Sequence, residues 1–164
     1  MDIALLLVRL IGFGLAAHGA QKLFGWFGGY GIAATGGYFE SIGFRPGRLF
    51  AAAAGANEVL AGLLLVLGLG GAIGPMLIIA TMIVAIFSVH WQHGFFGQNE
   101  GFELPLLYIA LALLLAFTGY GAYSLDAAFG IALPAATSWG LVGLGVLGGL
   151  ANLALRRAPA AKPA

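Results

Sequence analysis

Two groups of polar side chains in this sequence have residue types and spacings that suit chemistry. The first lies in the segment HGAQKLFG, where His18, Gln21 and Lys22 are three or four residues apart and therefore share one face of a helix. An imidazole, an amide and an ammonium group on one face can bind the polar end of a ligand. The alternative is that His18 and Lys22 lie at a lipid–water boundary and simply extend toward water.

The second group lies in the segment HWQHGFFGQNEGFE, which contains His90, His93, Glu100 and Glu103. Two imidazoles and two carboxylates form a donor set that zinc or iron can use. The glycines between them would have to fold the loop back on itself before the four side chains could converge. Hydrogen bonding and capping of the following helix need no such convergence, and carboxylates are favourable at a helix N-terminus. We therefore favour capping and assign no metal ligand.

Arg9 and Glu58 are isolated charges inside long apolar runs. Glu58 lies among small residues at three- or four-residue spacing, which predicts a helix face packed closely against a neighbour. Counted from the ends of their runs, Arg9 lies about 22 Å deep and Glu58 about 15 Å deep. Because an arginine side chain can span the difference of about 7 Å, we expect the two to form an ion pair. Such a pair either fixes helix register or lines a quinone or proton site.

The composition explains why these charges stand out. The chain has 164 residues, of which 61% are apolar and 8% charged, whereas soluble domains are about 25% charged. So few charges cannot cover a soluble globular domain, and the apolar content excludes intrinsic disorder. We therefore predict an all-α integral membrane protein surrounded by the lipid bilayer. The absence of cysteine excludes disulfides and thiolate metal sites, and the net charge of +1 argues against nucleic-acid binding.

Membrane-spanning helices must position the polar groups, since a helix satisfies its own backbone in lipid. A span needs about 20 apolar residues, and four runs meet this length: Ile3–Phe24, Leu49–Leu69, Gly71–Trp91 and Leu104–Leu125. The uncharged stretch Ala127–Leu155 predicts a fifth span, whose regular helix we expect to begin near Trp139. We expect the first span to be retained, not cleaved as a signal peptide, because an arginine interrupts it.

The basic residues predict the orientation of these spans. Between the first two spans lies a Gly-rich loop with a predicted short interfacial helix, Ile32–Ile42. With five spans, six basic residues lie on the side of this loop: Lys22, Arg45, Arg48, Arg156, Arg157 and Lys162. This side is therefore predicted to be cytoplasmic, with the N-terminus outside and the C-terminus inside. We expect a cytoplasmic-side cleft whose floor is Arg9 and Glu58 and whose rim is His18, Lys22, His90, His93 and Glu103.

Several stretches of the chain together resemble the DoxX family. They are Arg9, HGAQKLFGWFGGYG from His18, Asn57–Glu58 with Gly62–Leu64, His90, His93–Phe96, Glu100–Glu103 and GYGAYSLD from Gly119. The block HG-x-QK-x-FG is the most specific of them. The resemblance spans about residues 3–130 and adds Asn57 to the candidate ligand-binding residues.

The resemblance implies a small four-helix protein of the bacterial inner membrane that is associated with oxidoreductase complexes. One relative is a subunit of a thiosulfate:quinone oxidoreductase, and others associate with superoxide dismutase and a sulfurtransferase. We expect a four-helix domain over residues 1–130, a fifth membrane helix within 131–155 and a disordered cytoplasmic tail over 156–164. In the fifth helix Gly145, Gly149 and Asn152 form a small-residue face for packing on the bundle or on a partner, including a second copy of the chain.

The leading functional hypothesis is a membrane subunit of an oxidoreductase assembly that binds a quinone or a similar small apolar ligand. Without cysteine or a flavin motif, we expect no intrinsic cofactor, so electrons would come from redox partner proteins or a diffusible donor. The alternative is a non-enzymatic scaffold or assembly factor whose Gly-rich faces dock partner membrane proteins. A transporter is less favoured, because no pair of broken, repeated helices is evident.

Overall fold

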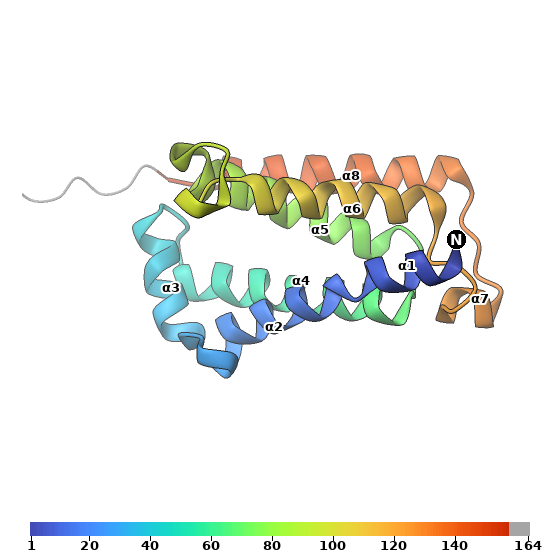
Figure 1. Ribbon diagram of the computed structural model, residues 1–164. Coiled ribbons are helices and arrows are strands. Elements are labelled where there is room, and N and C mark those ends of the chain that lie inside the picture. The colour runs from blue at the N-terminus through green and yellow to red at the C-terminus, as the bar shows by residue number, and fades with distance from the viewer. Residues whose placement is uncertain (158–164) are drawn as a thin grey trace, which may run out of the picture.

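The computed structural model describes residues 1–157, and every regular element within them is a helix (Figure 1). In chain order these are α1 (Asp2–Arg9), α2 (Ile11–Phe24), η1 (Trp26–Gly28), α3 (Gly31–Ser41), α4 (Gly47–Leu67), α5 (Ile73–Ala85), η2 (Ile86–His90), η3 (Trp91–His93), η4 (Gly97–Asn99), α6 (Glu103–Thr118), α7 (Leu125–Phe129) and α8 (Ala135–Ala154). The expected interfacial helix is present as α3.

Four helical segments are long and apolar enough to cross a membrane, which confirms an all-α polytopic membrane bundle. They are Asp2–Phe24, Gly47–Leu67, Ile73–His93 and Ala135–Ala154. The first combines α1 and α2, which join at Leu10, itself in a right-handed helical conformation, and the third combines α5 with the π-helical turn η2 and with η3. The additional helix that we expected at the C-terminus is therefore a full candidate span.

Two of the expected boundaries were wrong. The predicted span Leu104–Leu125 is the shorter helix α6, whose 16 residues end before Gly119. At about 1.5 Å per residue it is about 24 Å long, and the chain then folds into a loop that closes the end of the bundle. Conversely, α8 begins at Ala135 instead of near Trp139, because Pro134 lies at the N-cap position with an extended backbone. A proline is tolerated at the start of a helix, since the first N–H groups of a helix have no partner within it.

The helices pack in two groups joined through α4 and α5. In one group α2 lies antiparallel to α4, and glycines bring the two backbones together. A Cβ atom on Gly12 would lie 2.5 Å from the carbonyl oxygen of Gly62, and one on Gly19 would lie 2.5 Å from that of Gly55. Only glycine permits this approach, so the small residues around Glu58 set the register of α4 on α2.

In the second group α5 packs against α6 and α8. The predicted small-residue face of α8 packs on α5: a Cβ atom on Gly145 would lie 2.6 Å from the carbonyl oxygen of Met76, and one on Gly149 would lie 2.9 Å from that of Ala80. This face therefore belongs to the interior of the bundle. The core between the helices is apolar, with Leu65, Ile78 and Leu115 among its fully buried side chains.

One end of the bundle gathers α3, the loop between α5 and α6, and the C-terminal end of α8 (Figure 1). We call it the basic end, because it carries Lys22, Arg45, Arg48, Arg156 and Arg157. The last two were expected to belong to a disordered tail, but Arg156 Nε donates to the carbonyl of Ile42 at 2.6 Å and the backbone N–H of Arg157 donates to that of Gly43 at 2.9 Å. The rest of the expected tail, residues 158–164, lies outside the described residues.

Candidate functional site

A cavity of about 1270 Å³ reaches into the bundle from the basic end. Its walls come from α2, α3 and α4 on one side and from α5, η2, α6 and α8 on the other, so both groups of helices contribute. Most of the lining is apolar. The polar side chains on it are His18, Gln21, Lys22, Tyr30, Thr35, Tyr38, Asn57, Glu58, Thr81, Ser88, His90, Glu100, Tyr108 and Asn152.

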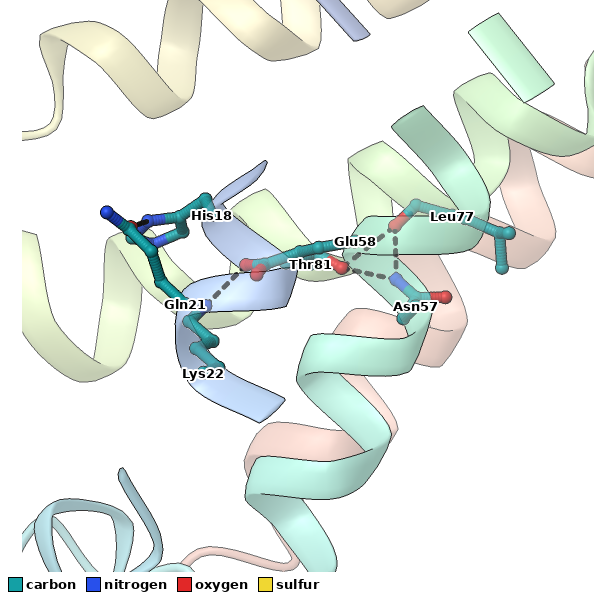
Figure 2. Close-up of polar contacts among 7 residues, drawn as sticks. All are labelled: His18, Gln21, Lys22, Asn57, Glu58, Leu77 and Thr81. Carbon is teal, nitrogen blue, oxygen red and sulfur yellow. Dashed lines mark hydrogen bonds and ion pairs between the residues drawn. The ribbon is translucent and has the colours of Figure 1, made fainter. Parts of the chain in front are cut away.

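Glu58 forms an ion pair with Lys22 at the wall of this cavity. The Nζ atom of Lys22 lies 2.5 Å from Oε1 of Glu58, and Figure 2 shows the two side chains pointing toward each other from α4 and α2. The Glu58 side chain is 2% exposed and that of Lys22 is 19% exposed. The stem of Lys22 therefore runs inward from the end of α2 and brings its charge to the carboxylate.

The second oxygen of Glu58, Oε2, is buried and has no hydrogen-bond partner within the described residues. Leaving a buried polar atom unpartnered costs about 1–3 kcal/mol, and more for a charged group. Such an atom beside a cavity is where a ligand or a water molecule gains most by binding.

Asn57 precedes Glu58 but points away from Lys22, toward α5. Its Nδ2 donates to the carbonyl of Leu77 at 3.0 Å and to Oγ1 of Thr81 at 2.5 Å, while the Thr81 hydroxyl donates to the same carbonyl at 3.0 Å (Figure 2). This network ties α4 to α5. The Asn57 amide is thereby committed to α5, although the residue borders the cavity.

His18 and Gln21 lie on the same face of α2, as their spacing predicted, and both line the cavity. Nδ1 of His18 is 3.0 Å from Oε1 of Gln21, and Nε2 of Gln21 donates to the carbonyl of Phe27 at 3.1 Å. The His18 ring is exposed and lines the cavity, and one of its two nitrogens is hydrogen-bonded to Gln21.

The predicted ion pair between Arg9 and Glu58 was wrong. The guanidinium of Arg9 donates instead to four backbone carbonyls, at 2.9 Å to Leu65, 2.6 Å to Val66, 3.2 Å to Tyr120 and 2.7 Å to Tyr123. The residue is 2% exposed and lies outside the cavity lining. The carbonyls of Leu65 and Val66 belong to the last turn of α4, where carbonyls lack the regular N–H donor four residues on and the helix end carries a partial negative charge. The Leu65 carbonyl also accepts the N–H of Gly68 at 3.0 Å. Depth alone therefore did not identify the partner of Arg9.

Of the four predicted residues His90, His93, Glu100 and Glu103, three take part in local hydrogen bonds of the segment between α5 and α6. Nδ1 of His90 is 2.6 Å from the carbonyl oxygen of Glu100, and the Glu103 carboxylate accepts the N–H of Gly97 at 2.7 Å. No three His, Asp or Glu side chains within residues 1–157 come together as a metal-binding set. His90 and Glu100 line the cavity, whereas His93 and Glu103 do not. Of the five residues that we expected at the rim, His18, Lys22 and His90 therefore line the cavity.

Sequence reasoning missed the tyrosines of the site. The hydroxyl of Tyr108, on α6, lies beside Gly14 of α2, 3.4 Å from the place of a Cβ atom there. A tyrosine in an uncharged span was the available signal, because a buried phenol usually needs a partner. On α3, Tyr38 lines the cavity near Glu100. Burial is the main cause of its raised pKa; the negative charge of Glu100 raises it further, and Arg156 opposes both.

Comparisons with known proteins support one assignment. The sequence model described as DoxX matches residues 4–91, more than half of the chain. The match covers α2, which carries His18 and Lys22, and α4, which carries Asn57 and Glu58, as well as α5. No curated protein and no solved structure matches the chain. The sequence model and the helical bundle agree with the resemblance seen in the sequence, and the chain belongs to the DoxX family.

Proposed function

We propose that this protein is the membrane subunit of an oxidoreductase assembly and that its cavity binds a quinone or a similar small apolar ligand. The observation that carries the proposal is the unpartnered Oε2 atom of Glu58 at the wall of a largely apolar cavity. Ligand sites combine apolar walls with a few polar groups that orient the ligand, and ionisable groups within a membrane bundle mark functional sites.

The size of the cavity supports a ligand with a ring and part of a chain. Its volume of about 1270 Å³ exceeds the roughly 300–1,000 Å³ of common ligand pockets. Lys22, Glu58 and Tyr108 provide polar contacts inside it, while Ala54, Met82 and other apolar residues face the rest of the space. The chain has no cysteine, and electrons would come from a partner protein or a diffusible donor.

The test is to purify the protein from native membranes and to identify bound lipids, cofactors and proteins by mass spectrometry. We expect an extractable quinone or similar apolar compound, which is lost in Glu58→Gln and kept in Glu40→Gln. The control fits because Glu40 is exposed, lies outside the cavity lining, and accepts a hydrogen bond from Gly47 that glutamine can also accept. An empty cavity in a sample that carries stoichiometric partner membrane proteins would contradict ligand binding and favour a scaffold.

We also propose that the protein lies in the bacterial inner membrane with its basic end in the cytoplasm, since basic residues are enriched on that side. The cysteine-free sequence permits a direct test with single cysteines. Tyr30→Cys lies near the basic end and Phe129→Cys in α7, where the wild-type side chains are 86% and 68% exposed. In intact cells, a membrane-impermeant maleimide is expected to label Phe129→Cys alone. Labelling of Tyr30→Cys alone would reverse the orientation.

A further inference from the structure

From the contacts around Glu58 we infer that the cavity selects a neutral ligand whose polar end donates a hydrogen bond, such as a hydroxyl or a phenol. This inference rests on the proposed ligand-binding function and narrows its ligand class. A quinone carries only acceptors at its carbonyl groups, whereas its reduced, dihydroxy form carries donors.

The need for a donor follows from the chemistry of the free atom. Oε2 of Glu58 is a carboxylate oxygen, so it can only accept. Its partner oxygen Oε1 is taken by Lys22 at 2.5 Å. Because the carboxyl group can turn about its last side-chain bond, whichever oxygen is not bonded to Lys22 is available to a ligand.

Several neighbouring side-chain donors are committed to other acceptors, and Tyr108, which lines the same cavity, makes no hydrogen bond to Oε2. The amide of Asn57 donates to Leu77 and Thr81, and the hydroxyl of Thr81 donates to Leu77 (Figure 2). On α2, the His18 ring is bonded to Gln21, whose own amide donates to Phe27. These contacts hold α2, α4 and α5 in place, so satisfying Oε2 from them would break bonds already made.

The charges at the site favour a ligand without a net charge. Lys22 and Glu58 form a pair that is neutral as a whole, and both are at least half buried between helices. An anionic head group such as a fatty-acid carboxylate would meet the Glu58 carboxylate, and a cationic amine would meet the Lys22 ammonium. A neutral hydroxyl can donate to Oε2 without either repulsion, and its own oxygen remains free to accept.

A matched pair of probes isolates the donor. The two compounds are 4-nonylphenol and its methyl ether, 4-nonylanisole, which have nearly the same shape and apolar chain but differ in the O–H group. The full chain is placed in phosphatidylcholine nanodiscs, and unlabelled compounds compete with tritiated 4-nonylphenol, with empty nanodiscs as the blank. We expect the phenol to compete about tenfold better than the ether, since an unpaired buried acceptor favours the ligand that satisfies it.

Substitution of Glu58 tests whether this atom is the source of the preference. In Glu58→Gln the side chain can turn an N–H toward the ligand, so the preference for the phenol is expected to fall to about onefold, whereas Glu40→Gln keeps it at about tenfold. A tenfold preference that persists in Glu58→Gln overturns the inference. Should that variant fail to fold, the preference of the wild-type protein for 4-nonylphenol over 4-nonylanisole decides whether a donor is required.

The outcomes separate the inference from the proposed function. Equal competition by the phenol and the ether would overturn the donor requirement and leave binding of an apolar ligand intact. Absence of any binding above the empty nanodiscs would overturn both.

Discussion

The Nε atom of Arg9 donates to the carbonyl of Leu65 at 2.9 Å, and this contact places an arginine at the C-terminal end of α4. Gly68 makes the approach possible: its φ of +61° turns the chain at the end of α4, and a Cβ atom there would lie 2.7 Å from Cζ of Arg9. Asp126 accepts the N–H groups of Gly70 and Gly71 in the same turn, at 2.8 and 2.7 Å. Arg9 therefore joins α1, α4 and the loop after α6 at the end of the bundle opposite the cavity.

Replacing Arg9 with methionine is expected to lower the free energy of unfolding by about 3 kcal/mol, because four carbonyls lose the hydrogen bond from Arg9 and, within residues 1–157, only that of Leu65 also accepts a backbone N–H, from Gly68 at 3.0 Å. Arg9→Lys is expected to lose less, since an ammonium group keeps the charge near the end of α4 but cannot reach all four oxygens. Unfolding in mixed detergent micelles, followed by circular dichroism, measures both. A wild-type stability for Arg9→Met would show that the carbonyls find other donors.

The charge swap Arg9→Glu with Glu58→Arg is expected to rescue neither single change.

Adding one methyl group at the contact of α2 with α4 is expected to destabilise the bundle. In Gly19→Ala the new Cβ atom meets the carbonyl oxygen of Gly55 at 2.5 Å and the backbone nitrogen of Val59 at 2.8 Å, and backbone atoms cannot move aside cheaply. Overpacking of this kind costs about 1–3 kcal/mol. Gly140→Ala in α8 is the matched control, because nothing lies within 4 Å of its Cβ position. It is expected to be neutral or stabilising by about 0.5–1 kcal/mol, and the same unfolding measurement compares the two.

The sequence predicted the membrane class, the four helical segments that are long enough to cross a membrane and the polar end that they share, because these depend on composition and on apolar run length. It also predicted that Glu58 faces a neighbouring helix, since small residues surround it at helical spacing. In the structure these residues pack against α2, with Gly55 opposite Gly19 and Gly62 opposite Gly12.

The partners of the buried charges could not be predicted in the same way. Counting residues placed Arg9 within about 7 Å of the depth of Glu58 and placed Lys22 at the rim, so it favoured the wrong basic residue of the first span. The choice depends on carbonyls at the end of α4 and in the loop around Tyr120, which have no signature in a sequence. The end of α6 at Thr118 was missed for a related reason. The residues after it are still apolar, but Gly119 and Gly121 have positive φ angles and turn the chain back over the bundle.

Removing the charge of Lys22 is expected to be costly, because it leaves the Glu58 carboxylate buried without a counter-ion. Lys22→Met is expected to lower the free energy of unfolding by about 3–5 kcal/mol. Adding Glu58→Leu to this variant is expected to recover most of the loss, since an apolar pair can replace a buried ion pair. The double-mutant cycle measures the coupling directly, and strictly additive effects would contradict a pairwise contact.

The double variant separates stability from ligand binding. It is expected to fold but to lose the preference for a phenol over its methyl ether, because neither the acceptor nor its counter-ion remains. Retention of that preference in the folded double variant would place the ligand contact elsewhere in the cavity.

The phenol of Tyr38 is expected to titrate above its ordinary value, because burial and the nearby Glu100 carboxylate raise its pKa. Glu100→Gln removes the negative charge and should lower this pKa, whereas Arg156→Gln removes an opposing positive charge and should raise it. A raised pKa means that the folded state favours the protonated phenol; at neutral pH the phenol is protonated in the folded and unfolded chain alike, so full stability is retained there. The folded state is penalised only as the pH rises above the pKa of the unfolded chain. Carbon-13 resonances of ring-labelled tyrosine, with Tyr38→Phe for assignment, follow the titration. Shifts of the same sign in both variants would contradict the placement of Tyr38 between Glu100 and Arg156 at the mouth of the cavity.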